Sequence, residues 1–192
     1  MPQPRIVLFT RFPEAGRAKT RLIPALGPER AAALHRQLTE RTLAAVRASG
    51  LPFELRITGA PPSAFTDWLG PVAVLEQGEG DLGERLARAG PPYPTIFIGA
   101  DAPDLTADLL LAAAAALSAC PATIGPAEDG GYWLLGLDRP VDGVFAGVDW
   151  GTAAVFAQTV DRLAASGIVP HLLPRLADCD RPEDFARWPD LA

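Results

Sequence analysis

The chain has 192 residues, 48% of them hydrophobic and 21% charged, with a formal net charge of −6. This length fits one domain, and the apolar content excludes a disordered chain because it suffices to build a core. The negative charge argues against nucleic acid as a partner, and no apolar run approaches the length of a membrane span. We therefore expect a single domain over residues 1–192, with no nucleic-acid or membrane partner and an oligomeric state left open. Because the N-terminus has no signal-peptide pattern, we also expect a cytoplasmic location.

Few soft metal ligands are present. The two cysteines, Cys120 and Cys179, form no CxxC pair, and His35 and His171 are the only histidines. A zinc site rich in cysteine or histidine is therefore excluded. Any metal must be held by oxygen ligands, which indicates Mg²⁺ or Mn²⁺.

Predicted strands and helices alternate along the chain. Residues 6–10 form a continuous apolar run, typical of a strand buried on both faces. A helix opens at residues 27–30 with proline in its first turn and ends near Gly50. Further helices are predicted at residues 61–68, 106–117 and 152–166, the last two capped by Thr106 and Thr152, and a short terminal helix at a capping box of Asp180 and Glu183. Further strands are predicted at residues 53–57, 72–75, 95–99, 122–125, 132–137 and 168–173, the last at a sheet edge because it contains Pro170.

This alternation predicts an α/β fold with three layers and a mostly parallel sheet. In such sheets ligands bind outside the carboxyl ends of the strands. The loops that follow Thr10, Leu75, Gly99 and Gly125 should therefore converge on one site.

The loop after the first strand, residues 10–22, contains four cations and a glycine in an acidic protein. Arginine and lysine side chains can hold a diphosphate, and a glycine lets the backbone approach it. The sequence does not match the Walker A pattern, and a solvated basic loop is the alternative interpretation. The candidate nucleotide-binding residues here are Thr10, Arg11, Gly16, Lys19 and Arg21.

A second glycine-rich segment, residues 77–85, follows the third predicted strand. Gln77, Gly78 and Gly80 are candidates for contact with a base or ribose. The alternative is a plain turn into the next helix with Asp81 as its cap.

A carboxylate at the end of a buried strand can bind a hard cation that bridges phosphates. Asp101 occupies this position and is the predicted metal ligand. Asp104 has either a direct role or a structural one as a helix cap. Asp178 and Asp180 are candidates for a second metal ligand, and Asp180 is the one that we assign.

The segment around residue 129 combines an acid, two glycines and two aromatic residues. This arrangement suits a sugar or similar acceptor beside a carboxylate that orients or deprotonates a hydroxyl. Asp129 is the candidate base, and Gly130, Gly131 and Tyr132 are candidates for substrate binding. The alternative is a glycine hairpin turn formed with Asp129.

Four segments together resemble the DUF2064 family of small GT-A-type glycosyltransferases. They are AKTRL at residues 18–22, GADAP at 99–103, GPAEDGGY at 125–132 and WGT at 150–152. The resemblance extends in order over nearly the whole chain. It implies a nucleotide-diphospho-sugar transferase fold, similar to the enzymes that form 2-phospholactate guanylyl esters or molybdopterin dinucleotides. It also implies that Asp101 is the metal-binding acid, although Ala102 and Pro103 stand where a DxD motif would continue.

Two activities fit these residues. In a metal-dependent glycosyltransferase, the metal and the basic loop, with Lys19 as catalytic cation, stabilise a leaving nucleoside diphosphate while an acceptor hydroxyl attacks the sugar. In a nucleotidyltransferase, the same loop holds a nucleoside triphosphate and pyrophosphate is released. The aromatic and acidic acceptor side favours the first, and a nucleotide-binding module without catalysis is a third possibility. The expected small-molecule partners are a nucleotide sugar or nucleoside triphosphate and an acceptor.

Overall fold

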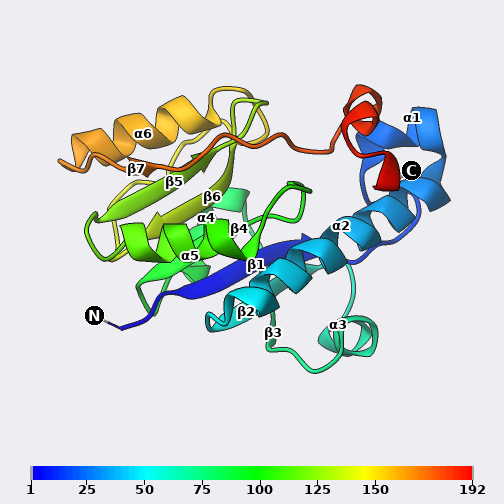
Figure 1. The fold of residues 1–192 in the computed structure, drawn as a ribbon, viewed down its shortest axis with the longest axis horizontal. Helices are drawn as coiled ribbons and strands as arrows, with labels where there is room; N and C mark the ends of the chain where they lie inside the picture. The colour runs from blue at the N-terminus through cyan, green and yellow to red at the C-terminus, as the bar shows by residue number, and fades with distance from the viewer. Residues whose placement is uncertain (1, 192) are drawn as a thin grey trace.

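The computed structural model describes residues 2–191 and is built around one seven-stranded sheet, in the order β3-β2-β1-β4-β6-β5-β7 (Figure 1). β6 runs antiparallel to β4 and β5, whereas the other neighbouring strands are parallel. The prediction of a mostly parallel α/β sheet is thus confirmed. The strands are β1 (Arg5–Arg11), β2 (Phe53–Thr58), β3 (Val74–Glu76), β4 (Thr95–Ile98), β5 (Ala122–Pro126), β6 (Tyr132–Leu137) and β7 (His171–Leu172).

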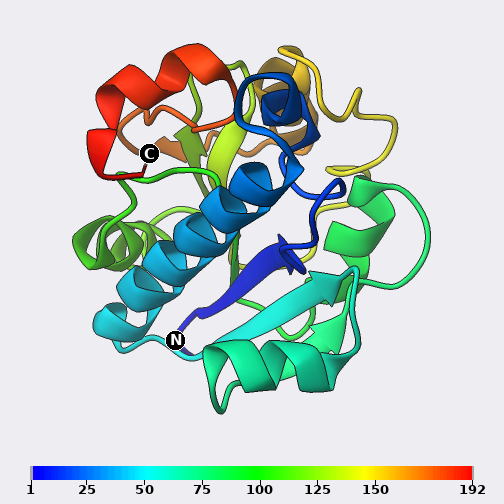
Figure 2. The same ribbon diagram turned by 90° about the vertical axis from the view of Figure 1, so that its right-hand side faces the viewer.

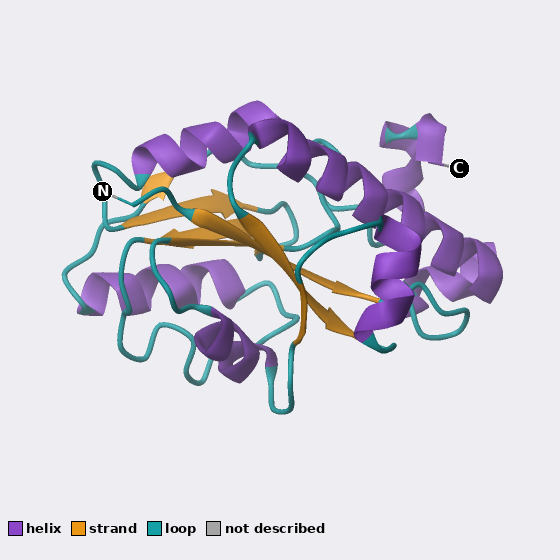
Figure 3. Ribbon diagram, turned by 90° about the horizontal axis from the view of Figure 1, so that it is seen from below, coloured by secondary structure: helices purple, strands orange, loops and turns teal. Residues whose placement is uncertain are grey.

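Helices cover both faces of the sheet, which gives the predicted three layers (Figure 3). One apolar cluster joins the sheet to α2 (Pro28–Ser49), α3 (Pro62–Leu69) and α5 (Ala107–Ala116). Another joins it to α4 (Leu82–Ala89) and α6 (Val155–Ala165). Within residues 2–191, no helix combines the length and the apolar character needed to cross a membrane.

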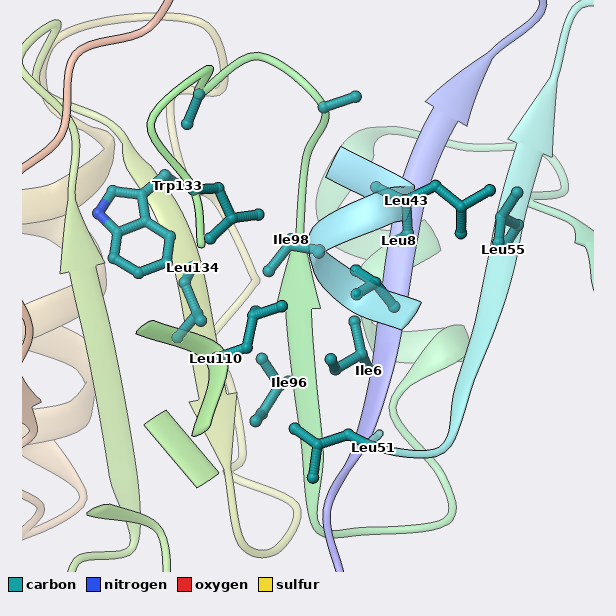
Figure 4. Packing of buried hydrophobic residues seen from close by; sticks show 14 of the residues in the cluster. Ile6, Leu8, Leu43, Leu51, Leu55, Ile96, Ile98, Leu110, Trp133 and Leu134 are labelled. Atoms are coloured by element: carbon teal, nitrogen blue, oxygen red, sulfur yellow. The ribbon is translucent and has the colours of Figure 1, made fainter. Parts of the chain in front are cut away.

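The central strands supply both clusters because successive side chains of a strand point to opposite faces. In β1, Ile6 and Leu8 pack beneath α2 and α5, while Val7 packs against the other helix layer (Figure 4). In β4, Ile96 and Ile98 belong to the first cluster and Phe97 to the second. A strand buried on both faces has a nearly continuous apolar run, which residues 6–9 of β1 and 96–98 of β4 show.

A third cluster lies beyond the sheet, where the last residues of the chain pack against the start of α2 (Figure 2). It combines Leu34 and Leu38 of α2 with Cys179, Trp188 and Leu191. The short elements here are the 3-10 helices η1 (Thr20–Leu22), η2 (Pro182–Arg187) and η3 (Pro189–Leu191), together with α1 (Ile23–Leu26). The C-terminal segment thereby returns to the basic loop that follows β1.

Two predicted strands are shorter or displaced. β3 begins at Val74, two residues later than predicted, and β7 contains only His171 and Leu172. β7 does lie at a sheet edge, as Pro170 indicated. Edge strands have one hydrogen-bonded neighbour, so less of the apolar pattern is enforced by burial and their ends are poorly specified.

Two predicted helix caps are wrong. The helix expected at Thr152 begins at Val155 after Ala154, which makes no side-chain cap, because the Thr152 hydroxyl instead donates to the carbonyl of Asp149. At the C-terminal segment, the backbone N–H groups of residues 180 and 181 donate to Asp184, not to Glu183. The side chain of Asp180 is therefore free to face two cations, as described below.

Candidate functional site

The carboxyl ends of β1, β4 and β5 lie at one edge of the sheet, and their loops meet there. β6 lies between β4 and β5 and runs antiparallel to both, so β4 and β5 point in the same direction. Four adjoining pockets open at this edge, and Asp101 lines all of them. The loops that follow β1, β3, β4 and β5 thus line one concave site, as the parallel-sheet geometry requires. We call the four adjoining pockets together the basin.

Lys19 lies at the centre of the polar side of this basin. Its ammonium is 2.8 Å from Oδ1 of Asp101 and 3.3 Å from Oδ1 of Asp180, and it donates to the Cys179 carbonyl at 2.6 Å. Its side chain is only 4% exposed. Lys19 is also the one non-glycine residue with positive φ among residues 2–191, at 48°. The structure therefore joins three predicted site residues, with Lys19 bridging the two predicted metal ligands.

The charges of this group stabilise one another. Burial alone would lower the pKa of Lys19, but the carboxylates of Asp101 and Asp180 raise it above its usual value. Desolvation alone would raise the pKa of Asp101, but the adjacent ammonium lowers it. Lys19 and Asp101 are therefore both charged near neutral pH.

The other cations of the basic loop extend from Lys19 toward solvent. Arg21 donates to Oδ2 of Asp180 at 2.6 Å, and Arg11 donates to the carbonyl of Arg17 at 2.9 Å. All three arginine side chains are exposed and line the pocket that also contains Lys19. Gly16 has φ 82°, and nothing lies within 4 Å of where its Cβ would be. Glycine is therefore favoured here by the left-handed backbone conformation and not by close packing.

Thr10 and Gln77 form hydrogen bonds that connect the segments around the site. The Thr10 hydroxyl lies 3.1 Å from the hydroxyl of Thr39 in α2. The buried Gln77 amide donates to the carbonyls of Thr10 and Arg56. Both residues line the pocket above β1 and β2, but their polar ends connect the loops to each other.

Gly78 and Gly80 are explained by the start of α4. A Cβ at Gly80 would overlap the Glu84 carboxylate, and a Cβ at Gly78 would overlap the guanidinium of Arg88. Glu84 and Asp81 form a capping box, in which each side chain accepts from the other's backbone N–H. The helix-cap interpretation of this segment is the one that these contacts support.

Asp129 lies across the basin from Lys19, in the turn between β5 and β6. Its Oδ1 accepts from the backbone N–H of Gly131 at 2.8 Å, and the side chain is exposed. Gly130 has φ 90° and packs against the backbone of Ala153, which leaves no room for a side chain. The turn interpretation is therefore present in the structure, and it holds the Asp129 carboxylate at the pocket.

Tyr132 presents its ring and not its hydroxyl to the basin. The ring lines two of the pockets, while the hydroxyl is buried without a hydrogen-bond partner among the described residues. Burial raises the pKa of Tyr132, so the phenol stays neutral. Its contribution to substrate binding would come from the ring face.

Two further titratable residues lie at the site, and one of them, His35, has no predicted role. Asp178 lines the pocket with Asp101 and Asp129, and burial, followed by repulsion from Asp129, raises its pKa to about 6. His35 of α2 is buried beneath the basic loop, with Nε2 3.0 Å from the carbonyl of Arg11. Nothing in its helical spacing distinguishes His35 from a core residue. Asp178, in contrast, is one of the two residues predicted as candidates for a second metal ligand.

Asp104 has a structural contact. Its Oδ1 accepts from the indole N–H of Trp188 at 2.9 Å. The carbonyl of Asp101 in the same loop accepts from the N–H of Cys179 at 2.8 Å. These bonds hold the C-terminal segment across the edge of the sheet, and so place Asp178 and Asp180 beside Asp101.

The donor chemistry suits a hard divalent cation only in part. Asp101, Asp129, Asp178 and Asp180 supply carboxylate oxygens around one pocket. However, within residues 2–191 no three ligating side chains converge, and both oxygens of Asp180 already accept from cations. Oδ2 of Asp101 has no partner in the described part of the chain, so a metal here would need further oxygens from a bound ligand.

A family model described as "Uncharacterized protein conserved in bacteria (DUF2064)" matches residues 39–152, more than half of the chain. The chain belongs to the DUF2064 family. The match extends from the second half of α2 to the turn before α6 and includes Asp101 and Asp129. A comparison with curated protein sequences found no match.

Solved structures share the fold of this DUF2064 chain. A "putative nucleotide-diphospho-sugar transferase" from Desulfovibrio desulfuricans G20 is 32% identical over 94% of this chain and 84% of its own, with a TM-score of 0.88. The Rv0371c protein of Mycobacterium tuberculosis H37Rv, in complex with manganese, is 22% identical over 97% of both chains, with a TM-score of 0.57. The 2-C-methyl-D-erythritol 4-phosphate cytidylyltransferase of Thermus thermophilus is 16% identical over 97% of both, with a TM-score of 0.56. The fold is that of nucleotide-diphospho-sugar transferases, as the resemblance implied.

Proposed function

We propose that this chain is a metal-dependent glycosyltransferase that uses a nucleotide-diphosphate sugar and a small-molecule acceptor. The observation that carries the proposal is that two compartments of opposite character adjoin at Asp101. One contains Lys19 and exposed arginines, and the other contains carboxylates and aromatic rings. The similarity to the Desulfovibrio protein supports a transferase.

The cationic compartment suits the diphosphate. Arg11, Arg17 and Arg21 have exposed guanidinium groups that can donate to phosphate oxygens in pairs. A diphosphate would also compete with the carboxylates for Lys19, whose fixed charge then stabilises the leaving group. The nucleoside would lie over the pocket that Thr10 and Gln77 line, above β1 and β2.

Asp101 is the residue we propose to hold Mg²⁺ or Mn²⁺, with Asp180 as the second ligand once its cations turn to the phosphates. Such an ion would neutralise charge that develops on the diphosphate. The free oxygen of Asp101 and the manganese complex of the Mycobacterium tuberculosis protein support this assignment.

Asp129 is the proposed base. The acceptor oxygen would form a bond to the sugar carbon and lose its proton to the Asp129 carboxylate. The bond from that carbon to the diphosphate oxygen would break, and its electron pair would leave with the diphosphate. The backbone bond from Gly131 orients the carboxylate for this role.

Nucleotidyl transfer is the second candidate, and the cytidylyltransferase of Thermus thermophilus, which shares the fold, favours it. Here an oxygen of a phosphorylated substrate would attack the α-phosphorus of a nucleoside triphosphate and release pyrophosphate. The same basic loop would hold the triphosphate. The acidic acceptor side makes this candidate weaker, since a phosphorylated substrate needs cations there.

A thermal-shift panel of nucleoside di- and triphosphates and nucleotide sugars, with and without Mn²⁺ or Mg²⁺, tests the proposal. A ligand at about 100 times its dissociation constant should add about 2.7 kcal/mol of stability, or roughly 5–10 °C in Tm. We expect nucleotide sugars or diphosphates to stabilise the protein only with metal, and Asp101→Asn to abolish the effect. Asp142→Asn, in an exposed loop outside the basin, is the matched control.

The products then separate the two activities. Release of nucleoside diphosphate from a stabilising nucleotide sugar supports glycosyl transfer, whereas pyrophosphate from a triphosphate supports nucleotidyl transfer. If no nucleotide stabilises the protein with either metal, the proposed nucleotide site is wrong.

A further inference from the structure

An apolar pocket adjoins Asp101 and Asp129 on the side away from the basic loop. It has a volume of about 300 Å³, within the range of small-molecule sites. Its walls come from β1, α4, β4, β6 and the segment that leads into α6. The apolar residues that define it are Phe9, Leu82, Leu86, Phe97, Trp150 and Val155.

The polar atoms of three aromatic side chains that line this pocket are hydrogen-bonded to the protein or buried without a partner among the described residues. The indole N–H of Trp133 donates to the carbonyl of Pro174 at 3.1 Å. The indole nitrogen of Trp150 and the hydroxyl of Tyr132 are buried from solvent. These three residues therefore offer ring faces and no hydrogen-bonding groups to a ligand.

The other polar side chains are few. The Thr152 hydroxyl already donates to the Asp149 carbonyl at 2.8 Å and accepts from the N–H of Ala154 at 3.3 Å. Only Asp101 and Asp129 remain, and Asp101 is the one that also lines the pocket of the basic loop. A sugar placed in this pocket would leave most of its hydroxyl groups without partners, and each unpaired buried group is costly.

We propose that the acceptor is an alcohol with an apolar body the size of an aromatic ring, and not a sugar. The body would fill the pocket between Leu82 and Trp150, and the single hydroxyl would face Asp129. The inference rests on the proposed transfer reaction and names its acceptor class. Leu82 lines the pocket and is 40% exposed, so its side chain is accessible to a ligand there.

Tryptophan fluorescence measures the occupancy of the pocket directly. Benzyl alcohol and methyl β-glucoside, which each contain one six-membered ring, serve as apolar and polar probes. Each is titrated into the intact protein with and without a stabilising nucleotide. We expect benzyl alcohol to change the fluorescence saturably and the glucoside not to do so. Trp133 and Trp150 both line the pocket, so Trp150→Phe should reduce that change and thereby assign it to the pocket.

Leu82→Gln should weaken benzyl alcohol binding by on the order of fivefold, the ratio for about 1 kcal/mol of lost apolar contact. Leu111→Gln is the matched control, because Leu111 is 43% exposed on α5, which covers the opposite face of the sheet. Neither leucine is buried, so both variants should fold.

Saturable binding of the glucoside alone, no binding of either probe, or equal effects of the two leucine variants would overturn the proposal. Nucleotide-dependent stabilisation, measured on the same samples, tests the proposed function separately. If nucleotides do not stabilise the protein while benzyl alcohol still binds, the result supports the apolar pocket and contradicts the proposed transfer reaction.

Discussion

At the scale of single residues, the site depends on side chains that neutralise one another when no ligand is bound. Lys19 bridges Asp101 and Asp180, and the left-handed backbone at Lys19 is a conformation that costs a non-glycine residue about 1 kcal/mol or more. Such strain persists only where surrounding contacts enforce it. Here three oxygen atoms hold the ammonium in place, which makes Lys19 a structural centre of the basin as well as its proposed catalytic cation.

His35 gives a pH-dependent prediction at this scale. Burial is the main cause that lowers its pKa, and the cations of Lys19 and Arg11 add to it, while Asp101 acts in the opposite direction. The unfolded chain therefore binds a proton near pH 6.5 that the folded chain does not, so stability is lost as pH falls below that value. The loss is at most about 1.4 kcal/mol per pH unit for one group.

We expect His35→Gln to reduce the loss of Tm between pH 7.5 and about 5.5, because glutamine cannot take up the proton. His171→Gln, which replaces the exposed histidine on β7, is the matched control. Thermal unfolding of the three proteins across this range makes the comparison. Parallel pH profiles for wild type and His35→Gln would contradict the prediction.

At the scale of elements, the segment before α4 shows how a ligand-like pattern can have a local cause. Asp81 and Glu84 cap the helix reciprocally, and Gly80 makes room for the Glu84 carboxylate. Asp81, Glu84 and Gly80 of the glycine-rich segment are thus accounted for by one helix start. The segment still borders the basin, through Leu82 and Gln77, because α4 begins at the carboxyl edge of the sheet.

Removal of this cap should lower stability without changing nucleotide binding. Asp81→Ala is expected to cost about 1 kcal/mol, or roughly 2–4 °C in Tm, because the N–H of residue 84 loses its acceptor. Asp142→Ala, in an exposed loop, should have almost no effect. A loss of nucleotide stabilisation in Asp81→Ala beyond the shift in Tm would show that this segment contacts the ligand after all.

At the scale of the whole molecule, we propose that the chain forms one cooperative domain. The C-terminal segment crosses the edge of the sheet and packs on the start of α2, so that the third apolar cluster is tied to the other two (Figure 2). The contacts are the bond from Trp188 to Asp104, the ion pair of Arg187 with Glu128, and the bonds of Asp180 to the basic loop. A segment held by such contacts should not unfold by itself.

Urea unfolding of variants that keep only Trp68 or only Trp188 tests this cooperativity. Trp68 reports on the first cluster and Trp188 on the third. We expect the fluorescence midpoint to coincide with the circular-dichroism midpoint of the same variant in both cases, as in two-state unfolding. An earlier fluorescence transition for Trp188 would instead identify the C-terminal segment as a separate unit.

The sequence by itself determined the layers, most of the elements and the side of the sheet where chemistry is expected. This was possible because the burial of β1 and β4 on both faces requires uninterrupted apolar runs, and because parallel strands bring their following loops to one edge. The resemblance carried by four segments determined the family. The basic loop, Asp101 and Asp129 could therefore be placed at one site before any contact was known.

Only the tertiary structure decided what these residues touch. Lys19 and Asp180 are 161 positions apart, and their pairing depends on the path of the C-terminal segment across the sheet edge. The same path places Asp178 at the pocket, and the packing of α2 buries His35 beneath the basic loop. Local sequence patterns specify strands and helix starts because those depend on near neighbours. The contacts of the site depend on which distant segments the core brings together, and this is settled only when the whole chain packs.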